Sequence, residues 1–384
     1  MFAERLKTRL KLHRQEGLYR KPPEILGREG KYLILAGGRV LNFASNDYLG
    51  LGVSDVLREK VADNFRKYGS SSSSSRLVSG NYALISEAEK AYARYFGYED
   101  ALFFPSGYQA NLALLSTLFD SGTAIVFDKH IHASSVKGIA LSPAELVGYN
   151  HGSLKHLKKR LEKVEKKEIV VLTESLFSMD GDLLDVPGLI DLKNRHGFLC
   201  VVDEAHAFGC LGEGGRGVAR PVADIAVGTF GKALGLFGAF ILLPALVKEY
   251  LFNFASPLIY STTLPEAHAV SALDILGLLG ESDDLRINLR EISKFMKTRL
   301  TAEGFSAQGD AHILALEIGD EQRALDVSNH LREKGIFVLS ARYPTVPLGK
   351  AILRIGMTAL HDEADVNGFI QSLKEVIKYE SGNS

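Results

Sequence analysis

An aspartate and a lysine each follow closely on a short apolar run of the sequence. Asp203 ends the run FLCVVD at 198–203, and Lys232 lies four residues after the run IAVG at 225–228. In a parallel sheet, ligands bind beyond the carboxyl ends of the strands, where we expect both side chains to lie. A carboxylate there can pair with a protonated ring nitrogen, and a partly desolvated lysine amine can form an imine.

A third segment could hold a phosphate group. The sequence FFPSGYQAN at 103–111 joins the end of a strand to the start of a helix, where the N–H groups of Gly107 and Tyr108 have no intrahelical acceptor. Taken alone, this segment is better explained as an ordinary turn capped by Ser106. His132 follows another expected strand and could stack on a flat ring, although a single histidine is more often structural. Combined with the lysine and the aspartate, these features match the requirements of pyridoxal 5'-phosphate.

Two other motifs suggest nucleotide chemistry, but their context is wrong. The glycines of 212–217 match G-x-G-x-x-G, yet Pro221 follows and no strand and helix flank them. The sequence DEAH at 203–206 is typical of helicases, which also need a phosphate-binding loop ending in Gly-Lys-Ser/Thr. Here Lys232 is followed by Ala233, which lacks the magnesium-binding hydroxyl group.

The chain has 384 residues and the composition of an ordinary globular protein with balanced charge. Lys and Arg total 45 and Asp and Glu total 46, which excludes a broad electrostatic footprint for nucleic acid or anionic membranes. Its two cysteines cannot form a disulfide framework or a four-cysteine zinc site. No apolar stretch reaches the roughly 18 residues of a membrane span, and the N-terminus lacks a secretory apolar core. We therefore expect a cytoplasmic protein without a metal, membrane or nucleic-acid partner.

The sequence alternates strand-like and helical segments from about residue 100, which predicts an α/β fold with a mostly parallel sheet. Seven short runs are expected to form this sheet, at 101–104, 124–128, 146–149, 169–173, 198–203, 225–229 and 239–243. The pattern then changes to helices at 266–279, 284–303, 320–334 and 362–379 and strands at 313–317, 336–339 and 351–358. This change indicates a smaller α+β domain at the C-terminal end.

We expect three parts, which are an N-terminal arm and hairpin at 1–45, a large cofactor-binding domain at 46–265 and a small domain at 266–384. The arm carries a basic amphipathic helical pattern over residues 1–20, typical of a helix that packs on a partner. Gly37 and Gly38 separate two short strand-like runs and are expected to form a two-residue hairpin loop.

Six consecutive serines at 70–75 form an unusual run. It is either a flexible linker or a short polar loop within the large domain.

Eight stretches carry a joint pattern: NFASNDYLGL at 42–51, SGYQAN at 106–111, HAS at 132–134, SMDG at 178–181, DEAH at 203–206, the glycines of 212–217, TFGK at 229–232 and YST at 260–262. Together they resemble the α-oxoamine synthases, a family of fold-type-I pyridoxal-phosphate enzymes, over nearly the whole chain. The stretch RYPTVP at 342–347, followed by Leu353 and Arg354, most resembles family members that use L-alanine and a pimeloyl thioester.

The resemblance implies a role for each motif residue. Lys232 would bind the cofactor covalently and move protons, Asp203 would pair with the pyridine nitrogen, and His132 would stack on the ring. The remaining cofactor contacts would come from Gly107, Tyr108, Ser178, His206 and Thr229, with Ser261 and Thr262 reaching across the interface of a homodimer. The expected substrate contacts are Arg20, Asn46, His132, Thr345 and Arg354. Arg354 would bind the amino-acid carboxylate through both guanidinium nitrogens.

The implied reaction is a decarboxylative condensation of L-alanine with a pimeloyl group carried on coenzyme A or on an acyl carrier protein. Glycine with a short acyl-CoA is one alternative, and a binding module that keeps the fold without catalysis is another. The chain also departs from the family, which tends to have several glycines at 70–75 and usually has His and Leu where this chain has Ile85 and Ala88.

Overall fold

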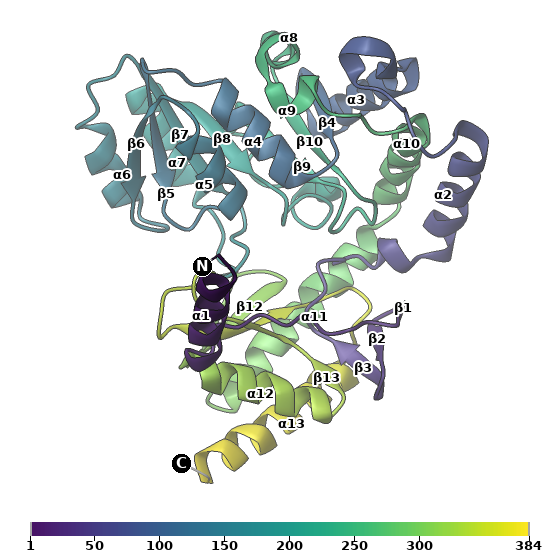
Figure 1. Cartoon of the computed structure of the whole chain (residues 1–384), viewed down its shortest axis with the longest axis vertical. Helices are drawn as coiled ribbons and strands as arrows, with labels where there is room; N and C mark the ends of the chain where they lie inside the picture. Colours follow the sequence, from purple (N-terminus) through teal and green to yellow (C-terminus); the bar gives the residue numbers. More distant parts are fainter. Residues whose placement is uncertain (1, 383–384) are drawn as a thin grey trace. The chain divides into compact units, whose positions relative to one another are not determined.

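In the computed structural model, which describes residues 2–382 and their side chains as far as Lys378, the chain divides into two compact units (Figure 1). The small unit comprises Met1–Val53, Ser178–Asp182 and Ile287–Ser384, and the large unit comprises Ser54–Phe177 and Leu183–Arg286. The N-terminal arm is thus grouped with the C-terminal segment. The sequence-based division, with boundaries after residues 45 and 265, had placed these two segments in separate parts.

The large unit is built on a seven-stranded sheet, as the sequence predicted. In spatial order the strands are β4 (Asp100–Phe104), β10 (Ala239–Leu243), β9 (Ile225–Thr229), β8 (Leu199–Asp203), β7 (Glu168–Glu174), β5 (Thr123–Asp128) and β6 (Glu145–Tyr149). β10 runs antiparallel to both of its neighbours, and all pairs from β9 to β6 are parallel. This mostly parallel architecture confirms the predicted fold class.

Helices cover both faces of this sheet because successive side chains of each strand point to opposite sides. Val170 and Leu172 pack with one set of helices and Val171 with the other. The first set is α4 (Gly107–Thr117), α5 (Ala133–Ala140), α8 (Ala245–Phe254) and α9 (Ser256–Ile259), and the second is α6 (Leu154–Leu161) and α7 (Val186–His196). α10 (Glu266–Gly280) packs against α2 (Asp55–Tyr68) and α3 (Ala83–Phe96).

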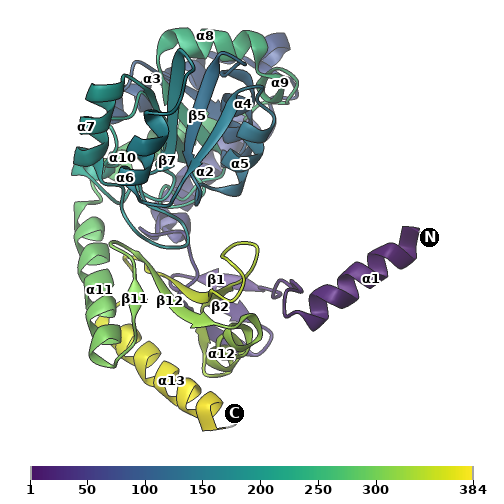
Figure 2. The ribbon, with the colours of Figure 1, turned by 90° about the vertical axis from the view of Figure 1, so that its left-hand side faces the viewer.

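The small unit contains two four-stranded sheets. The first is β1 (Gly27–Glu29), β2 (Tyr32–Leu35), β3 (Gly38–Asn42) and β13 (Ile336–Phe337), and the second is β11 (Ala307–Gln308), β12 (Ile313–Gly319), β15 (Ala351–Gly356) and β14 (Leu339–Ala341). Its helices are α1 (Phe2–Gln15), most of α11 (Asp283–Ala302), α12 (Glu321–Glu333) and α13 (Glu363–Gly382) (Figure 2). The parallel pairing of β3 with β13 explains why the arm is grouped with the C-terminal segment.

Two local predictions for the small unit need correction. The expected strand at 336–339 breaks at Val338 into β13 and β14, which belong to different sheets. The predicted hairpin forms, but Leu35 pairs with Gly38, so its two-residue loop is Ala36 and Gly37. Gly38 has a φ of 116°, a conformation that favours glycine, and begins β3.

The serine run forms a structured loop that is tied to residues near 262. Ser72 donates a hydrogen bond from its Oγ to the Thr263 carbonyl at 2.8 Å, and the Thr263 N–H donates to the Ser74 carbonyl at 3.0 Å. A π-helical turn, Arg76–Gly80, follows. These bonds favour the short polar loop over the flexible linker. Ile85 and Ala88 lie fully buried on α3, where apolar side chains fill the core.

Two short 3₁₀ turns complete the elements, Leu51–Val53 and Glu213–Gly215. Gly212, Gly214, Gly215 and Gly217 all have positive φ, so the glycine cluster forms a tight loop and does not open a helix. No helix among residues 2–382 combines the length and the apolar character needed to cross a membrane.

Candidate active site

A cavity of about 190 Å³ lies at the carboxyl ends of the strands of the large unit. β7 ends at Glu174, β8 at Asp203 and β9 at Thr229, so three polar side chains meet at one sheet edge. We call this space the strand-end cavity. It is lined by Gly107, Tyr108, Asn111, His132, Ser134, Glu174, Asp203, Ala205, His206, Val227, Gly228, Thr229 and Lys232.

Lys232 projects its amine toward a histidine. The distance from Lys232 Nζ to His206 Nε2 is 2.7 Å, which makes the two side chains hydrogen-bond partners. The turn that carries Lys232 is held by Thr229, whose Oγ1 accepts the Gly231 N–H at 3.1 Å and donates to the Gly238 carbonyl at 2.9 Å. The chain therefore fixes the base of the lysine while leaving its amine in the cavity.

A continuous hydrogen-bond network joins Asp203 to His132. Asn111, on the first turns of α4, donates from Nδ2 to Asp203 Oδ2 and to Ser134 Oγ, both at 3.0 Å. Ser134 Oγ lies 2.7 Å from His132 Nδ1. Ala205 N–H donates to the other oxygen of Asp203 at 2.9 Å, so the aspartate carboxylate is held from two sides.

Glu174 is a buried carboxyl group beside Asp203, with 2% of its surface exposed. Its Oε1 accepts the backbone N–H of His132 at 2.5 Å. Burial raises the pKa of Glu174 well above its usual value, and the negative charge of Asp203 adds to this rise. Desolvation lowers the pKa of His132, and Lys232 adds to that lowering while Asp203 opposes it. The cavity thus holds a carboxyl group that resists ionisation and an imidazole that resists protonation.

The start of α4 forms another wall of the cavity. Ser106 caps the helix by accepting the Gln109 N–H at 3.2 Å, and a Cβ atom at Gly107 would meet no atom within 4 Å. The Gln109 side chain donates to Ser261 Oγ at 2.7 Å, which ties the Ser261 segment to α4. Thr262 forms a bridge with Ser75 and, like Ser261, is not among the residues that line the cavity.

Of the predicted substrate contacts, His132 belongs to the large unit, and the other four belong to the small unit, as does Ser178. Arg354 is 3% exposed and donates to the Ser178 carbonyl at 2.6 Å, to Asn46 Oδ1 at 3.1 Å and to the Tyr48 hydroxyl at 3.3 Å. These acceptors are all neutral, so among the described residues no carboxylate is hydrogen-bonded to this buried guanidinium.

Arg20 and Thr345 lie together in a second cavity of about 420 Å³, within the small unit. An Arg20 nitrogen lies 3.5 Å from Thr345 Oγ1. We call this cavity the arginine pocket, because three arginines line it, Arg20, Arg332 and Arg342. Lys21 adds a fourth positive charge. None of its described lining residues is an aspartate or a glutamate.

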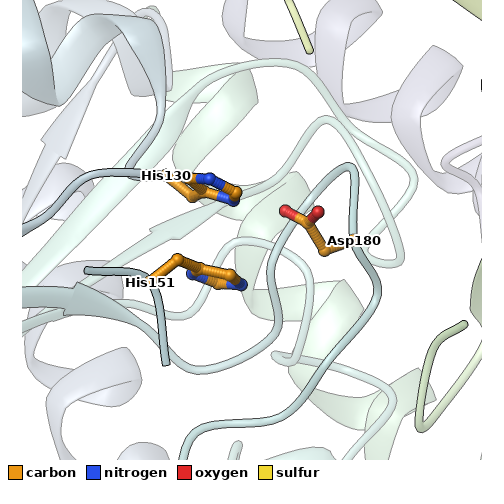
Figure 3. Close-up of side chains that lie close together, drawn as sticks. All are labelled: His130, His151 and Asp180. Atoms are coloured by element: carbon orange, nitrogen blue, oxygen red, sulfur yellow. The ribbon is translucent and has the colours of Figure 1, made fainter. Parts of the chain in front are cut away.

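Two further histidines lie beyond the ends of β5 and β6. The rings of His130 and His151 stack with a centroid distance of 4.0 Å and an interplanar angle of 8° (Figure 3). Nδ1 of His151 lies 3.0 Å from Asp128 Oδ1, at the end of β5. Neither ring is among the described residues that line the strand-end cavity.

The sequence-based selection omitted three polar side chains of this cavity, namely Asn111, Ser134 and Glu174. Glu174 carried the same signal as Asp203, because it directly follows a predicted strand. Asn111 and Ser134 lie within two of the motifs quoted for the family resemblance, but nothing in their spacing shows that their side chains meet.

Comparisons with known proteins agree with this geometry. Residues 38–373 match the family described as aminotransferase class I and II. An 8-amino-7-oxononanoate synthase from Geobacter sulfurreducens is 37% identical over 374 residues, covering 95% of this chain and 96% of that protein. Among solved structures, a variant serine palmitoyltransferase from S. paucimobilis with a bound PLP–myriocin aldimine is 26% identical. It has a TM-score of 0.90 and covers 97% of each chain. An 8-amino-7-oxononanoate synthase from Francisella tularensis is 31% identical with a TM-score of 0.76, covering 89% of this chain and 99% of that one.

The chain belongs to the class I and II aminotransferase family and, within it, to the α-oxoamine synthases, which makes it a pyridoxal-phosphate-dependent acyltransferase. The strand-end cavity fits this cofactor, since it contains an amine, a buried carboxylate and an uncrowded helix N-terminus for the aldehyde, the ring nitrogen and the phosphate.

Proposed function

We propose that this chain condenses L-alanine with a pimeloyl thioester, with loss of carbon dioxide, to form 8-amino-7-oxononanoate, a step of biotin biosynthesis. The observation that carries the proposal is the 37% identity to the Geobacter sulfurreducens enzyme over 95% of this chain. The Francisella tularensis structure, which bears the same enzyme name, supports it.

Lys232 and Asp203 are the central residues of this proposal. Pyridoxal phosphate supplies an aldehyde that links to amines and a protonated ring that stabilises negative charge at the substrate α-carbon. Lys232 would hold the cofactor through Nζ, and its free amine would remove and return the proton at the α-carbon of alanine. His206 orients that amine across 2.7 Å. Asp203 pairs with the ring nitrogen, and Asn111 keeps its carboxylate in place.

The remaining cofactor contacts follow from the family resemblance. His132 would contact the ring and the substrate, and its lowered pKa keeps it neutral near pH 7. Ser178 and His206 bind the ring oxygen. The phosphate is held by Gly107, Tyr108 and Thr229, together with Ser261 and Thr262 from across the interface of a homodimer.

Arg354 binds the α-carboxylate of alanine. A buried guanidinium whose hydrogen bonds go only to neutral acceptors carries an uncompensated charge, which a carboxylate offsets with two parallel hydrogen bonds. Asn46, bonded to Arg354, lies beside that carboxylate, and Arg20 and Thr345 contact the acyl donor in the arginine pocket.

A second candidate reaction uses L-serine and a long-chain acyl thioester. The TM-score of 0.90 to serine palmitoyltransferase favours it, although the identity of 26% is lower than that to the enzymes named for 8-amino-7-oxononanoate synthesis.

A product assay tests the proposal directly. The purified enzyme, loaded with pyridoxal phosphate, is incubated with L-alanine, glycine or L-serine and with pimeloyl, acetyl, succinyl or palmitoyl thioesters, and the amino ketone is identified by mass spectrometry. We expect the highest kcat/KM with L-alanine and the pimeloyl thioester. A higher value with L-serine and palmitoyl thioester would favour the second candidate. A higher value with glycine would indicate a reaction like that of 2-amino-3-ketobutyrate ligase or 5-aminolevulinate synthase.

A further inference from the structure

Asn111 and Ser134 are buried polar side chains that lie between two proposed cofactor contacts, Asp203 and His132. Asn111 is 3% exposed, and Ser134 is fully buried. Asn111 keeps the Asp203 carboxylate in place, but the proposed chemistry does not use its second hydrogen bond, which goes to Ser134. The direction of the hydrogen bonds along this chain determines which ring nitrogen of His132 carries the proton.

Helices α4 and α5 bring the two side chains together. Asn111 lies on α4, and Ser134 lies on the first turn of α5. Gly138 follows Ser134 by four residues, so it faces the same side of α5. A Cβ atom at Gly138 would lie 2.9 Å from the Asn111 carbonyl oxygen, which is closer than real Cβ contacts come. The glycine therefore allows the close approach that lets the Asn111 amide reach Ser134 Oγ at 3.0 Å.

The Asp203 carboxylate fixes the orientation of the Asn111 amide. An ionised carboxylate only accepts hydrogen bonds, so the amide nitrogen and not the amide oxygen must face Asp203 Oδ2. The same nitrogen has a second hydrogen, which it donates to Ser134 Oγ. Ser134 Oγ therefore accepts from Asn111, and its own hydrogen remains for another partner.

That partner is the side chain of His132. Ser134 Oγ lies 2.7 Å from His132 Nδ1, and the Ser134 N–H donates to the same nitrogen at 3.3 Å. Two donors converge on Nδ1, which makes it an unprotonated acceptor. If Nδ1 carried the proton, it would face the Ser134 N–H, and the buried Ser134 hydroxyl hydrogen would have no acceptor among residues 2–378, which costs free energy. In the neutral imidazole the proton then belongs to Nε2.

We propose that Asn111 and Ser134 are positioning residues that keep the His132 proton on Nε2, so that the ring offers an N–H donor to an oxygen of the bound substrate. The inference rests on the proposed function, in which His132 contacts the substrate. A neutral N–H donor in a fixed orientation stabilises a substrate oxygen that gains negative charge during the reaction. Desolvation lowers the pKa of His132, which keeps the ring in the neutral form that this role needs.

A purely structural role for these side chains explains less. The bond from Asn111 to Asp203 is enough to hold the carboxylate, and the Ser134 N–H is enough to cap the start of α5 through Nδ1. Neither task needs the hydroxyl group of Ser134. Ser135 is the next residue on α5 and is almost as completely buried, but it lies outside the chain of hydrogen bonds from Asp203 to His132, which makes it a matched control.

Nuclear magnetic resonance of the holoenzyme with isotope-labelled histidine tests the position of the proton, because protonated and unprotonated ring nitrogens differ in chemical shift. The His132→Gln variant identifies the His132 signals by their loss. We expect the wild type to carry the proton on Nε2 and Ser134→Ala to show a mixture of both tautomers. Ser135→Ala is expected to match the wild type.

A second variant reverses the chain of hydrogen bonds without changing its shape. Asn111→Asp puts a carboxyl oxygen where the amide nitrogen lies, and this oxygen accepts from Ser134 and draws the hydroxyl hydrogen away from His132. Ser134 Oγ can then accept from Nδ1, so we expect the His132 proton to move toward Nδ1. A proton on Nδ1 in the wild type, or unchanged nitrogen signals in both Ser134→Ala and Asn111→Asp, would overturn the proposal.

Steady-state kinetics of the holoenzyme show whether the tautomer matters for turnover. We expect Ser134→Ala to lose roughly 10- to 100-fold in kcat/KM, with the cofactor absorbance and the melting temperature unchanged, while Ser135→Ala behaves like the wild type. A rise in KM for L-alanine assigns the donor to the amino-acid carboxylate, and a loss confined to the thioester assigns it to the thioester carbonyl.

Wild-type turnover in Ser134→Ala despite a changed tautomer, or an equal loss in Ser135→Ala, would also overturn the proposal. Failure of the proposed function looks different. The wild type would then prefer another amino acid or acyl thioester, whereas the proton of His132, which is located without any substrate, would still lie on Nε2.

Discussion

The amine of Lys232 lies 2.7 Å from Nε2 of His206, inside a cavity bounded by Asp203 and the start of α4. Because this amine is the proposed attachment point of the cofactor, Lys232→Ala is expected to lose the visible absorbance band of the covalent adduct and roughly 10⁴-fold in kcat. The exposed Lys155→Ala serves as control and should keep both. If the band persisted in Lys232→Ala, another residue would have to hold the cofactor.

Glu174 positions His132 through its backbone, since its Oε1 accepts the His132 N–H at 2.5 Å. Glu174→Gln keeps an acceptor there, whereas Glu174→Ala leaves a partly buried N–H without its side-chain acceptor. We therefore expect Glu174→Ala to lose about 1–3 kcal/mol of unfolding free energy relative to Glu174→Gln, as well as more activity. Denaturant unfolding and kcat of both variants measure this difference, and equal values for the two would contradict the positioning role.

Asp203 was selected because it lies at the carboxyl end of a predicted strand, where ligands bind in parallel sheets. Glu174 directly follows a predicted strand, so the same argument could have predicted it. Asn111 and Ser134 could not be predicted, because which side of α4 faces Asp203 depends on the packing of α4 against α5 and the sheet. All seven strands of the large sheet were predicted, since each is a short apolar run. Their spatial order was not predicted, although the nine residues separating β9 from β10 are too few for a parallel crossover.

The small unit was harder to predict because its sheets join distant segments. The strand predicted at 336–339 was correctly placed along the chain, but nothing local indicates that β13 pairs with β3, about 300 residues earlier, while β14 pairs with β15. That pairing is decided by tertiary packing.

Arg354 is expected to matter more for binding than for stability. Its guanidinium is buried among neutral acceptors, so removing the charge also removes its desolvation cost. Arg354→Gln should raise KM for L-alanine roughly 100-fold through loss of the bidentate contact, while the melting temperature stays within about 3 °C of the wild type. Arg323→Gln, an exposed change in α12, is the control. An unchanged KM in Arg354→Gln would exclude the proposed carboxylate contact.

Arg76 and Glu89 form a buried ion pair that anchors the turn after the serine run. Glu89 also accepts hydrogen bonds from Lys248 and from the Phe103 N–H, both at 2.9 Å, so it stays buried when Arg76 is removed. Lys248 still pairs with Glu89 in this variant, so Arg76→Met should cost about 1–3 kcal/mol of unfolding free energy, measured by urea denaturation. Arg66→Met breaks an exposed pair with Asp63 and should cost less than about 1 kcal/mol. Similar losses of unfolding free energy in the two variants would show that burial does not make the Arg76 pair more important for stability than an exposed pair.

Glu204 makes the stability of the fold depend on pH. Its side chain is fully buried, and burial raises its pKa to about 7, although the N–H groups of Ala219 and Val218 favour the ionised form. The folded state then binds a proton that the unfolded chain has released, so the unfolding free energy falls as pH rises from about 4.5 through about 7. Glu204→Gln cannot titrate. Between about pH 5 and about pH 8 the wild type should lose about 2–3 kcal/mol relative to this variant, as measured by denaturant unfolding at both pH values. The exposed Glu165→Gln should show no such difference, and a wild type that gained stability relative to Glu204→Gln between the lower and the higher pH would reverse the predicted sign.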